Sequence, residues 1–303
     1  MSTIIFNDKI LKIHTNKAHS IFSSGGKQAY KYIEGSFGII YSDYDCDKKM
    51  INDWKQEKFD KFFINSPRKI TIDMDDKIKF HKVMSQSKYT PESYLNLKEV
   101  CDKDALYFVK NTAGSGSTGV DIYDYEKLQT VDLKNCIIQK NIDNPHLHNN
   151  KRYKIRQLVL LHNKKVYLHK DSFFTMSHVD YTNTEEINVR DKHIIYQKDD
   201  TIFELSQKLE DFELIFKNII DAVRDFKKYY GKQINCIPEN EYSILGFDLI
   251  VDSDKNVQII EINHRSNYKH PKNVCDDCDV RFIRDMILVM IEKKTEQTRL
   301  IEI

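Results

Sequence analysis

The sequence predicts an α+β fold, in which strands and helices are interleaved without a regular βαβ order. Two observations support this prediction. Short apolar segments are joined in pairs by turn-forming residues, as in hairpins, whereas other segments place apolar residues three and four positions apart, as helices do. The 303 residues, 40% of them hydrophobic, are enough for one large domain or two to three small ones.

The N-terminal half begins with short apolar runs separated by polar breaks, which predict a small α/β domain over residues 1–70. The spacing of Ile78, Val83 and Met84 predicts a helix over residues 75–87, which ends before Pro91. Strands are then expected at residues 105–110, 120–125 and 136–139.

The polar turn formers of residues 143–150 predict a boundary between a central subdomain, residues 71–143, and a C-terminal subdomain, residues 144–303. Beyond this boundary, His162 and Asn163 separate two apolar runs and predict a hairpin. The other expected elements are strands at 157–161, 164–168, 244–251 and 257–262, and helices over 201–229 and 279–293.

The charge and hydropathy patterns exclude some classes of protein. A net charge of +1 gives no whole-chain argument for binding nucleic acid or an anionic membrane. No apolar run approaches the roughly 20 residues that span a bilayer, and the N-terminus carries charges where a signal peptide has an apolar core. We therefore expect a cytoplasmic protein with reduced cysteines. The sequence does not indicate an oligomeric state.

Three oxygen-bearing side chains converge in the predicted hairpin of residues 244–263. If the chain turns near residue 254 or 255, Asp248 lies opposite Glu261, and Asn263 shares a face with Glu261. Carboxylates within apolar strands need compensation, which a hard cation such as Mg²⁺ supplies together with phosphates and water. The alternative is a solvated hairpin with these polar residues facing water.

A glycine-rich loop separates the strands expected at 105–110 and 120–125. Gly114, Gly116 and Gly119 match G-x-G-x-x-G, but a dinucleotide-binding fold requires a helix next, and here a strand pattern follows. A loop of this kind can instead close over phosphates, with Lys110 within reach of them. The alternative is an ordinary flexible hairpin loop.

Alternate positions of residues 152–156 are basic. Arg152, Lys154 and Arg156 share one face of a strand, where they could neutralise phosphates or line a solvated edge. Cys275 and Cys278 form a C-x-x-C pair without the second pair that zinc usually needs, so reduced cysteines at the surface or at a helix cap are expected instead.

The order of these motifs resembles the ATP-grasp superfamily and, within it, the tubulin–tyrosine ligase family, over about residues 65–266. The resemblance implies an ATP-grasp fold, in which two α+β subdomains grip the nucleotide. It also implies a ligase that uses ATP and Mg²⁺ to activate a carboxylate as an acyl phosphate, which an amine then attacks. The substrates would be an acidic peptide or protein tail, or a small carboxylate, together with an amino-acid amine.

The resemblance also assigns roles to residues. Arg156 and Lys110 would be catalytic, Lys77 and Lys110 would bind phosphates, and Gly114, Gly116 and Gly119 would belong to the loop over them. The hinge that holds adenine would comprise Gln139, Lys140 and Ile142, and the magnesium ligands would be Asp248, Glu261 and Asn263, with Asp248 also facing the nucleotide.

The sequence departs from the family pattern mainly on the acceptor side. Lys154 stands where the family has an acidic residue, residues 172–177 lack an expected arginine, and residues 193–196 lack the expected Thr and Asn. Three alternatives stay open: a small-molecule carboxylate–amine ligase, a nucleotide-binding pseudo-ligase acting through protein contacts, and a binding protein without a nucleotide site.

Overall fold

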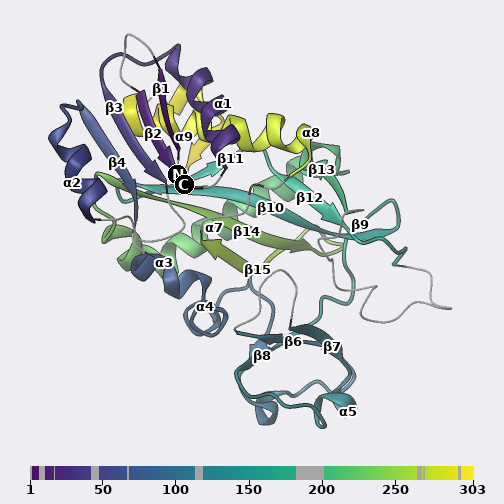
Figure 1. The fold of residues 1–303 in the computed structure, drawn as a ribbon. Helices are drawn as coiled ribbons and strands as arrows, with labels where there is room; N and C mark the ends of the chain where they lie inside the picture. The colour runs from purple at the N-terminus through teal and green to yellow at the C-terminus, as the bar shows by residue number, and fades with distance from the viewer. Residues whose placement is uncertain are drawn as a thin grey trace.

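A computed structural model shows that the described residues form a twelve-stranded mixed sheet, a separate four-stranded antiparallel sheet, and helices packed around them (Figure 1). This combination confirms the predicted α+β fold. The structure describes residues 2–6, 11–16, 18–41, 48–66, 68–112, 119–181, 201–264, 268, 270–292 and 295–303.

The large sheet joins elements from both ends of the chain. Strands β2, β3 and β4 run parallel, and β4 pairs in parallel with β14, which continues into the antiparallel series β14–β10–β11–β16. Strand β15 pairs with β14 as its hairpin partner. The strands are β1 Ser2–Phe6, β2 Leu11–Thr15, β3 Phe37–Tyr41, β4 Lys61–Asn65, β9 Leu147–His148, β10 Lys151–His162, β11 Lys165–His169, β12 Phe173–Met176, β13 Ile202–Leu205, β14 Glu241–Val251, β15 Val257–His264 and β16 Leu300–Glu302.

Helices pack on both faces of the large sheet and form two cores. On one face, α1 and α9 cross each other and bury residues such as Phe22 and Ile283. On the other face, α7 has apolar residues at every third or fourth position and buries Phe226 against Phe247. The helices are α1 His19–Tyr30, α2 Lys48–Gln56, α3 Arg68–Asp75, α4 Lys77–Met84, α5 Tyr125–Leu128, α7 Phe212–Asn235, α8 Lys272–Val274 and α9 Val280–Glu292, with a π-helical turn η3 at Cys275–Asp279 and 3₁₀ turns η1 Leu97–Glu99, η2 Ser206–Lys208 and η4 Thr295–Gln297.

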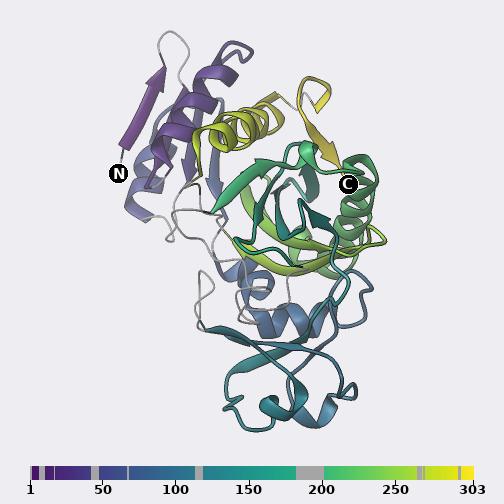
Figure 2. The ribbon, with the colours of Figure 1, turned by 90° about the vertical axis from the view of Figure 1, so that its right-hand side faces the viewer.

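The small sheet forms a separate layer at the lower end of both views (Figures 1 and 2). Its strand order is β5–β8–β6–β7, and it has its own core around Tyr107, Val109 and Ile138. The strands are β5 Ser93–Tyr94, β6 Tyr107–Asn111, β7 Val120–Tyr123 and β8 Cys136–Lys140.

Most expected elements are confirmed, and three need correction. Residues 201–211 are not helical: Phe203 and Leu205 lie on β13, which pairs with β12, and the helix begins only at Phe212. The expected helix over residues 75–87 is shorter. It is α4, which begins after Asp76, whose carboxylate accepts a hydrogen bond from the Lys79 amide as an N-cap.

The third correction concerns the hairpin of β10 and β11. Its turn residues are Asn163 and Lys164, one position later than expected, and His162 pairs with Lys165. Both turn residues have positive φ, 49° and 61°, as the tight turn of a twisted hairpin requires. Among the described residues, no helix combines the length and apolarity needed to cross a membrane.

Candidate functional site

A cleft lies where the small sheet approaches α4 and β15. It is lined by side chains from α3, α4, β6, β8 and β15 and from the segment that leads into β5. The polar lining includes Lys77, His81, Lys110, Gln139 and Glu261. The structure therefore brings together residues that are up to 184 positions apart in the sequence (Lys77 to Glu261), and four of these five were predicted as site residues.

Lys110 is a buried cation at the centre of this cleft. Its side chain comes from β6, is only 7% exposed, and donates hydrogen bonds to Gln139 Oε1 at 2.6 Å and to the Ile260 carbonyl at 3.4 Å. Burial lowers the pKa of the Lys110 ammonium to about 8, although Glu261 opposes this shift. The protein therefore keeps a poorly solvated cation facing the cleft.

The β14–β15 hairpin places the predicted carboxylates opposite each other. Asp248 pairs with Glu261, as expected, and Asn263 pairs with Gly246. The register shifts between Asp248 and Leu249, because Leu249 pairs with Ile259 and leaves Ile260 as an extra residue on β15. This bulge leaves the Ile260 carbonyl outside the regular strand pairing, and that carbonyl accepts from Lys110.

Two cations bind the buried carboxylate of Asp248. Arg156, on β10, lies directly opposite Asp248 on β14 and places its Nε 2.6 Å from Oδ1. Lys154, also on β10, places its Nζ 2.8 Å from Oδ2. Burial alone raises the pKa of Asp248, but the attraction of Arg156 and Lys154 outweighs it, so this pKa lies below its usual value. Glu261, opposite Asp248, has Lys77 Nζ at 3.5 Å.

The residues of this hairpin fit a hard cation by their chemistry. Two carboxylates directly opposite each other repel unless positive charge lies between or beside them, and Mg²⁺ prefers carboxylate and amide oxygens. Lys77, Lys154 and Arg156 already neutralise both carboxylates, so a divalent cation fits only together with an anion such as a polyphosphate. Within the described part of the chain, no three His, Cys, Asp or Glu residues group as a metal site, and the predicted set contains only two carboxylates plus Asn263.

Several predicted site residues lie outside the cleft lining. The Lys140 side chain forms an ion pair with Asp102 at 2.7 Å, and Ile142 is half-buried in the loop after β8. Gly119 ends the glycine-rich loop with φ of 70°, and its carbonyl accepts from Asn111. Gly114 and Gly116 lie outside the described residues. Asn263 Nδ2 lies 3.5 Å from the Gly246 carbonyl oxygen.

The structure also adds residues that the sequence reasoning missed. His81 lies one turn after Lys77 on α4 and lines the same cleft, and burial lowers its pKa. Their i, i+4 spacing on a predicted helix was an available signal. Ser93 accepts a hydrogen bond from Gln139 Nε2 at 3.2 Å and so orients the amide toward Lys110. No sequence pattern indicated Ser93.

The other motifs have structural partners. Cys278 is buried, which corrects the expectation of a surface or cap position, and both Cys275 and Cys278 are free thiols in η3. His270, which is near the two cysteines in sequence, places its Nδ1 2.6 Å from Asp279 Oδ2. Arg152 is buried and donates to Asn141 at 2.9 Å rather than joining Lys154 and Arg156 on the carboxylate.

The fold and the cleft define an ATP-grasp-like protein, in which a small antiparallel sheet and a larger α+β part face each other across a cationic cleft. A model of the tubulin-tyrosine ligase family matches residues 49–298, so the chain belongs to that family. No individual curated protein matches the chain significantly. Family membership indicates an ATP-dependent ligase that forms amide bonds, with protein or peptide and amino-acid substrates at that coarse level.

Proposed function

We propose that the cleft binds ATP with Mg²⁺, and that the protein joins an amino acid to the carboxylate of a protein or peptide. The observation that carries this proposal is the surplus of positive charge around the carboxylate pair. Lys77, Lys154 and Arg156 bind the two carboxylates, and Lys110 adds a fourth cation with no carboxylate hydrogen-bonded to it among its described contacts. Asp75 also lines the cleft, so four cations face three carboxylates. A polyphosphate would supply the missing negative charge.

The proposed roles follow from where each side chain lies. Lys77 and Lys110 would bind phosphate oxygens, because both line the cleft. Arg156 would move from Asp248 toward the transferred phosphoryl group and stabilise its developing charge. Asp248, Glu261 and Asn263 would hold the magnesium ion, which when bound neutralises phosphate charge.

The nucleotide base would lie beside the end of β8 and the segment that follows it. Gln139 would present its amide to the cleft, and the backbone at Lys140 and Ile142 would contact adenine. The loop that contains Gly114, Gly116 and Gly119 would cover the phosphates and exclude water. The division of the chain at residues 70 and 143 stays a prediction, in which residues 71–143 and 144–303 close on the nucleotide.

Thermal unfolding with and without ATP and Mg²⁺ tests the proposal. Ligand at a hundred times its Kd should stabilise the wild type by about 2.7 kcal/mol. We expect Glu261→Gln to reduce the magnesium-dependent part of this shift, because it removes one carboxylate charge. Glu239→Gln, which removes an exposed carboxylate outside the cleft, is the matched control. The absence of any shift in the wild type at millimolar ATP would refute nucleotide binding.

A pseudo-ligase is the second candidate, and one contact favours it. Lys154, which stands where the family has an acidic residue, binds Asp248 at 2.8 Å and so competes with a metal ion for that carboxylate. This candidate predicts an ATP-dependent thermal shift without ADP release for any acceptor. Lys154→Asp should then strengthen the effect of Mg²⁺ on ATP binding. ADP release by the wild type with an acidic peptide and an amino acid would exclude this candidate.

A further inference from the structure

Helices α1 and α9 lie on the opposite side of the large sheet from α4 and the small sheet (Figures 1 and 2). A second cationic pocket lies there, between the end of α1, α9 and the segment before β16. It holds about 400 Å³ of open space and shares no lining residue with the cleft. We call it the arginine pocket. Its lining consists of Gln28, Lys31, Tyr32, Arg281, Arg284 and Arg299.

Close packing of α1 against α9 builds this pocket. A Cβ at Gly25 would lie 2.8 Å from the Cβ of Ile283, so only glycine allows the two helices to approach this closely. The approach brings Arg284, the residue after Ile283, to 5.4 Å from the ring centroid of Tyr32. Arg281 lies one turn earlier on the same side of α9.

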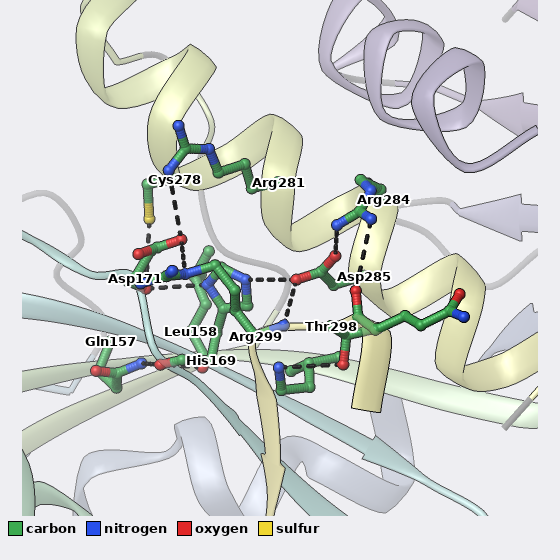
Figure 3. Close-up of polar contacts among 12 residues, drawn as sticks. Gln157, Leu158, His169, Asp171, Cys278, Arg281, Arg284, Asp285, Thr298 and Arg299 are labelled. Atoms are coloured by element: carbon green, nitrogen blue, oxygen red, sulfur yellow. Dashed lines mark hydrogen bonds and ion pairs between the residues drawn. The ribbon is translucent and has the colours of Figure 1, made fainter. Parts of the chain in front are cut away.

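Two buried carboxylates, Asp171 and Asp285, form ion pairs with the arginines (Figure 3). Arg299 Nε lies 2.7 Å from Asp171 Oδ2, and Arg284 Nη1 lies 2.6 Å from Asp285 Oδ1. Arg281 Nη1 lies 3.9 Å from the same Asp171 oxygen, and its Nη2 donates at 2.6 Å to Oδ1 of Asp277, a partly exposed carboxylate one turn earlier. Each guanidinium carries five N–H donors, and a carboxylate engages only part of them. The arginines are therefore oriented before any ligand arrives, which reduces the entropy lost on binding.

These arginines could serve only as counterions for the two buried carboxylates. Arg281 also pairs with the partly exposed Asp277, but the exposure of Arg299 argues for more: its side chain is 46% exposed, although the carboxylate of its partner Asp171 is almost fully buried. Lys31 adds a fourth cation from α1, which Asp171 and Asp285 do not require. The pocket thus combines four cations from three segments, the end of α1, α9 and the residues before β16, and no described carboxylate is among its lining residues.

We propose that the arginine pocket binds a small polyanion, a compound that carries two or more phosphate or carboxylate groups. Planar guanidinium groups match both kinds of oxyanion in bidentate geometry. A single oxyanion would reach only some of four cations spread around 400 Å³, whereas two linked groups would engage both the α1 side and the α9 side. The exposed ring of Tyr32 adds an apolar surface for the part of the ligand that joins the charges.

Equilibrium dialysis of the full chain with radiolabelled pyrophosphate and radiolabelled citrate, at low ionic strength, measures this binding directly. The two probes separate a phosphate ligand from a carboxylate ligand. We expect Arg281→Gln and Lys31→Glu each to weaken binding roughly fivefold, as exposed ion pairs do, and higher salt to weaken it further. Lys31→Glu contacts neither buried carboxylate, so it keeps the test valid if Arg281→Gln does not fold.

Two controls separate the arginine pocket from other cationic surfaces. Arg224→Gln removes an exposed arginine on α7 and should leave binding unchanged. Lys110→Met should remove any pyrophosphate that binds in the nucleotide cleft but leave citrate binding and the remaining pyrophosphate binding in the arginine pocket, so the result is independent of the proposed ligase function. The proposal is overturned if neither probe binds the wild type, if binding is insensitive to both pocket variants, or if Lys110→Met alone abolishes it.

Discussion

Replacing Lys110 by methionine should stabilise the protein without ligand while removing its response to ATP. The ordinary pKa of a lysine is 10.5, and burial lowers that of Lys110 to about 8. A difference of roughly 2.5 pKa units corresponds to about 3 kcal/mol at neutral pH, which the folded state loses by keeping this ammonium charged. Methionine removes that cost but leaves Gln139 Oε1 without its donor, at about 1–2 kcal/mol. The net gain in unfolding free energy should be about 1–2 kcal/mol at pH 7.

The pH dependence of this gain tests the cause. Between pH 8 and 10.5 the unfolded wild type binds more protons at Lys110 than the folded one, so wild-type stability rises with pH in that window. The advantage of Lys110→Met should therefore be constant below pH 8, shrink by about 3 kcal/mol toward pH 10.5, and reverse in sign. Subtracting the unfolding free energy of the wild type from that of the variant at each pH cancels the contribution of groups that titrate alike in both proteins.

Urea unfolding at pH 7, 9 and 10 provides the measurement. Lys228→Met, at an exposed position on α7, is the matched control and should change stability by less than about 0.5 kcal/mol at every pH. The burial argument is refuted if Lys110→Met is less stable than the wild type at pH 7, or if its advantage is the same at all three pH values. Persistence of the ATP-dependent thermal shift in this variant would separately contradict the phosphate-binding role of Lys110.

Four further substitutions, one of them also combined with Lys154→Met, have defined outcomes in urea unfolding. Asp248→Asn should destabilise by about 3 kcal/mol, because it leaves two cations without their carboxylate; adding Lys154→Met should recover part of the loss, and no recovery would contradict the charge explanation. Gly25→Ala should cost about 1–3 kcal/mol by overpacking against α9. Gly231→Ala, in α7 with no atom within 4 Å of the new Cβ, should instead stabilise by about 0.5–1 kcal/mol; equal effects at the two glycines would exclude overpacking. Tyr242→Phe should cost about 1 kcal/mol, because its hydroxyl donates to the Ile40 carbonyl across the buried core, and an unchanged stability would show that this bond contributes nothing net.

Local patterns predicted the elements that depend on neighbouring residues. Strand alternation and turn residues between 244 and 263 were enough to place Asp248 and Glu261 on opposite strands. Helical spacing indicated α4, and Asp76 is the N-cap that begins it. The family resemblance rested on the order of the motifs from Val109-Lys110 to the hairpin of residues 246–263, and the family match over residues 49–298 confirms it.

Local patterns failed where partners distant in sequence decide the structure. Residues 201–211 contain apolar positions that fit a helical period, but Phe203 and Leu205 also alternate, and the free edge of β12 selects the strand. The order of the strands in the large sheet was likewise not predictable from the sequence, because β4 and β14 pair residues that are 177 positions apart (Asn65 with Tyr242 and Ile64 with Glu241). Such pairing depends on the packing of the whole sheet.

By itself the sequence determined the chemistry of the cleft: the carboxylate hairpin, the cations near it and the family to which they belong. Only the tertiary structure decided how these groups act on each other. The bulge at Ile260, which the sequence did not indicate, leaves a carbonyl that accepts from Lys110. The lowered pKa of Lys110 and the arginine pocket on the other side of the sheet both result from segments that pack together only in the folded chain. Burial and charge proximity depend on contacts between segments far apart in the chain, which a linear pattern does not encode.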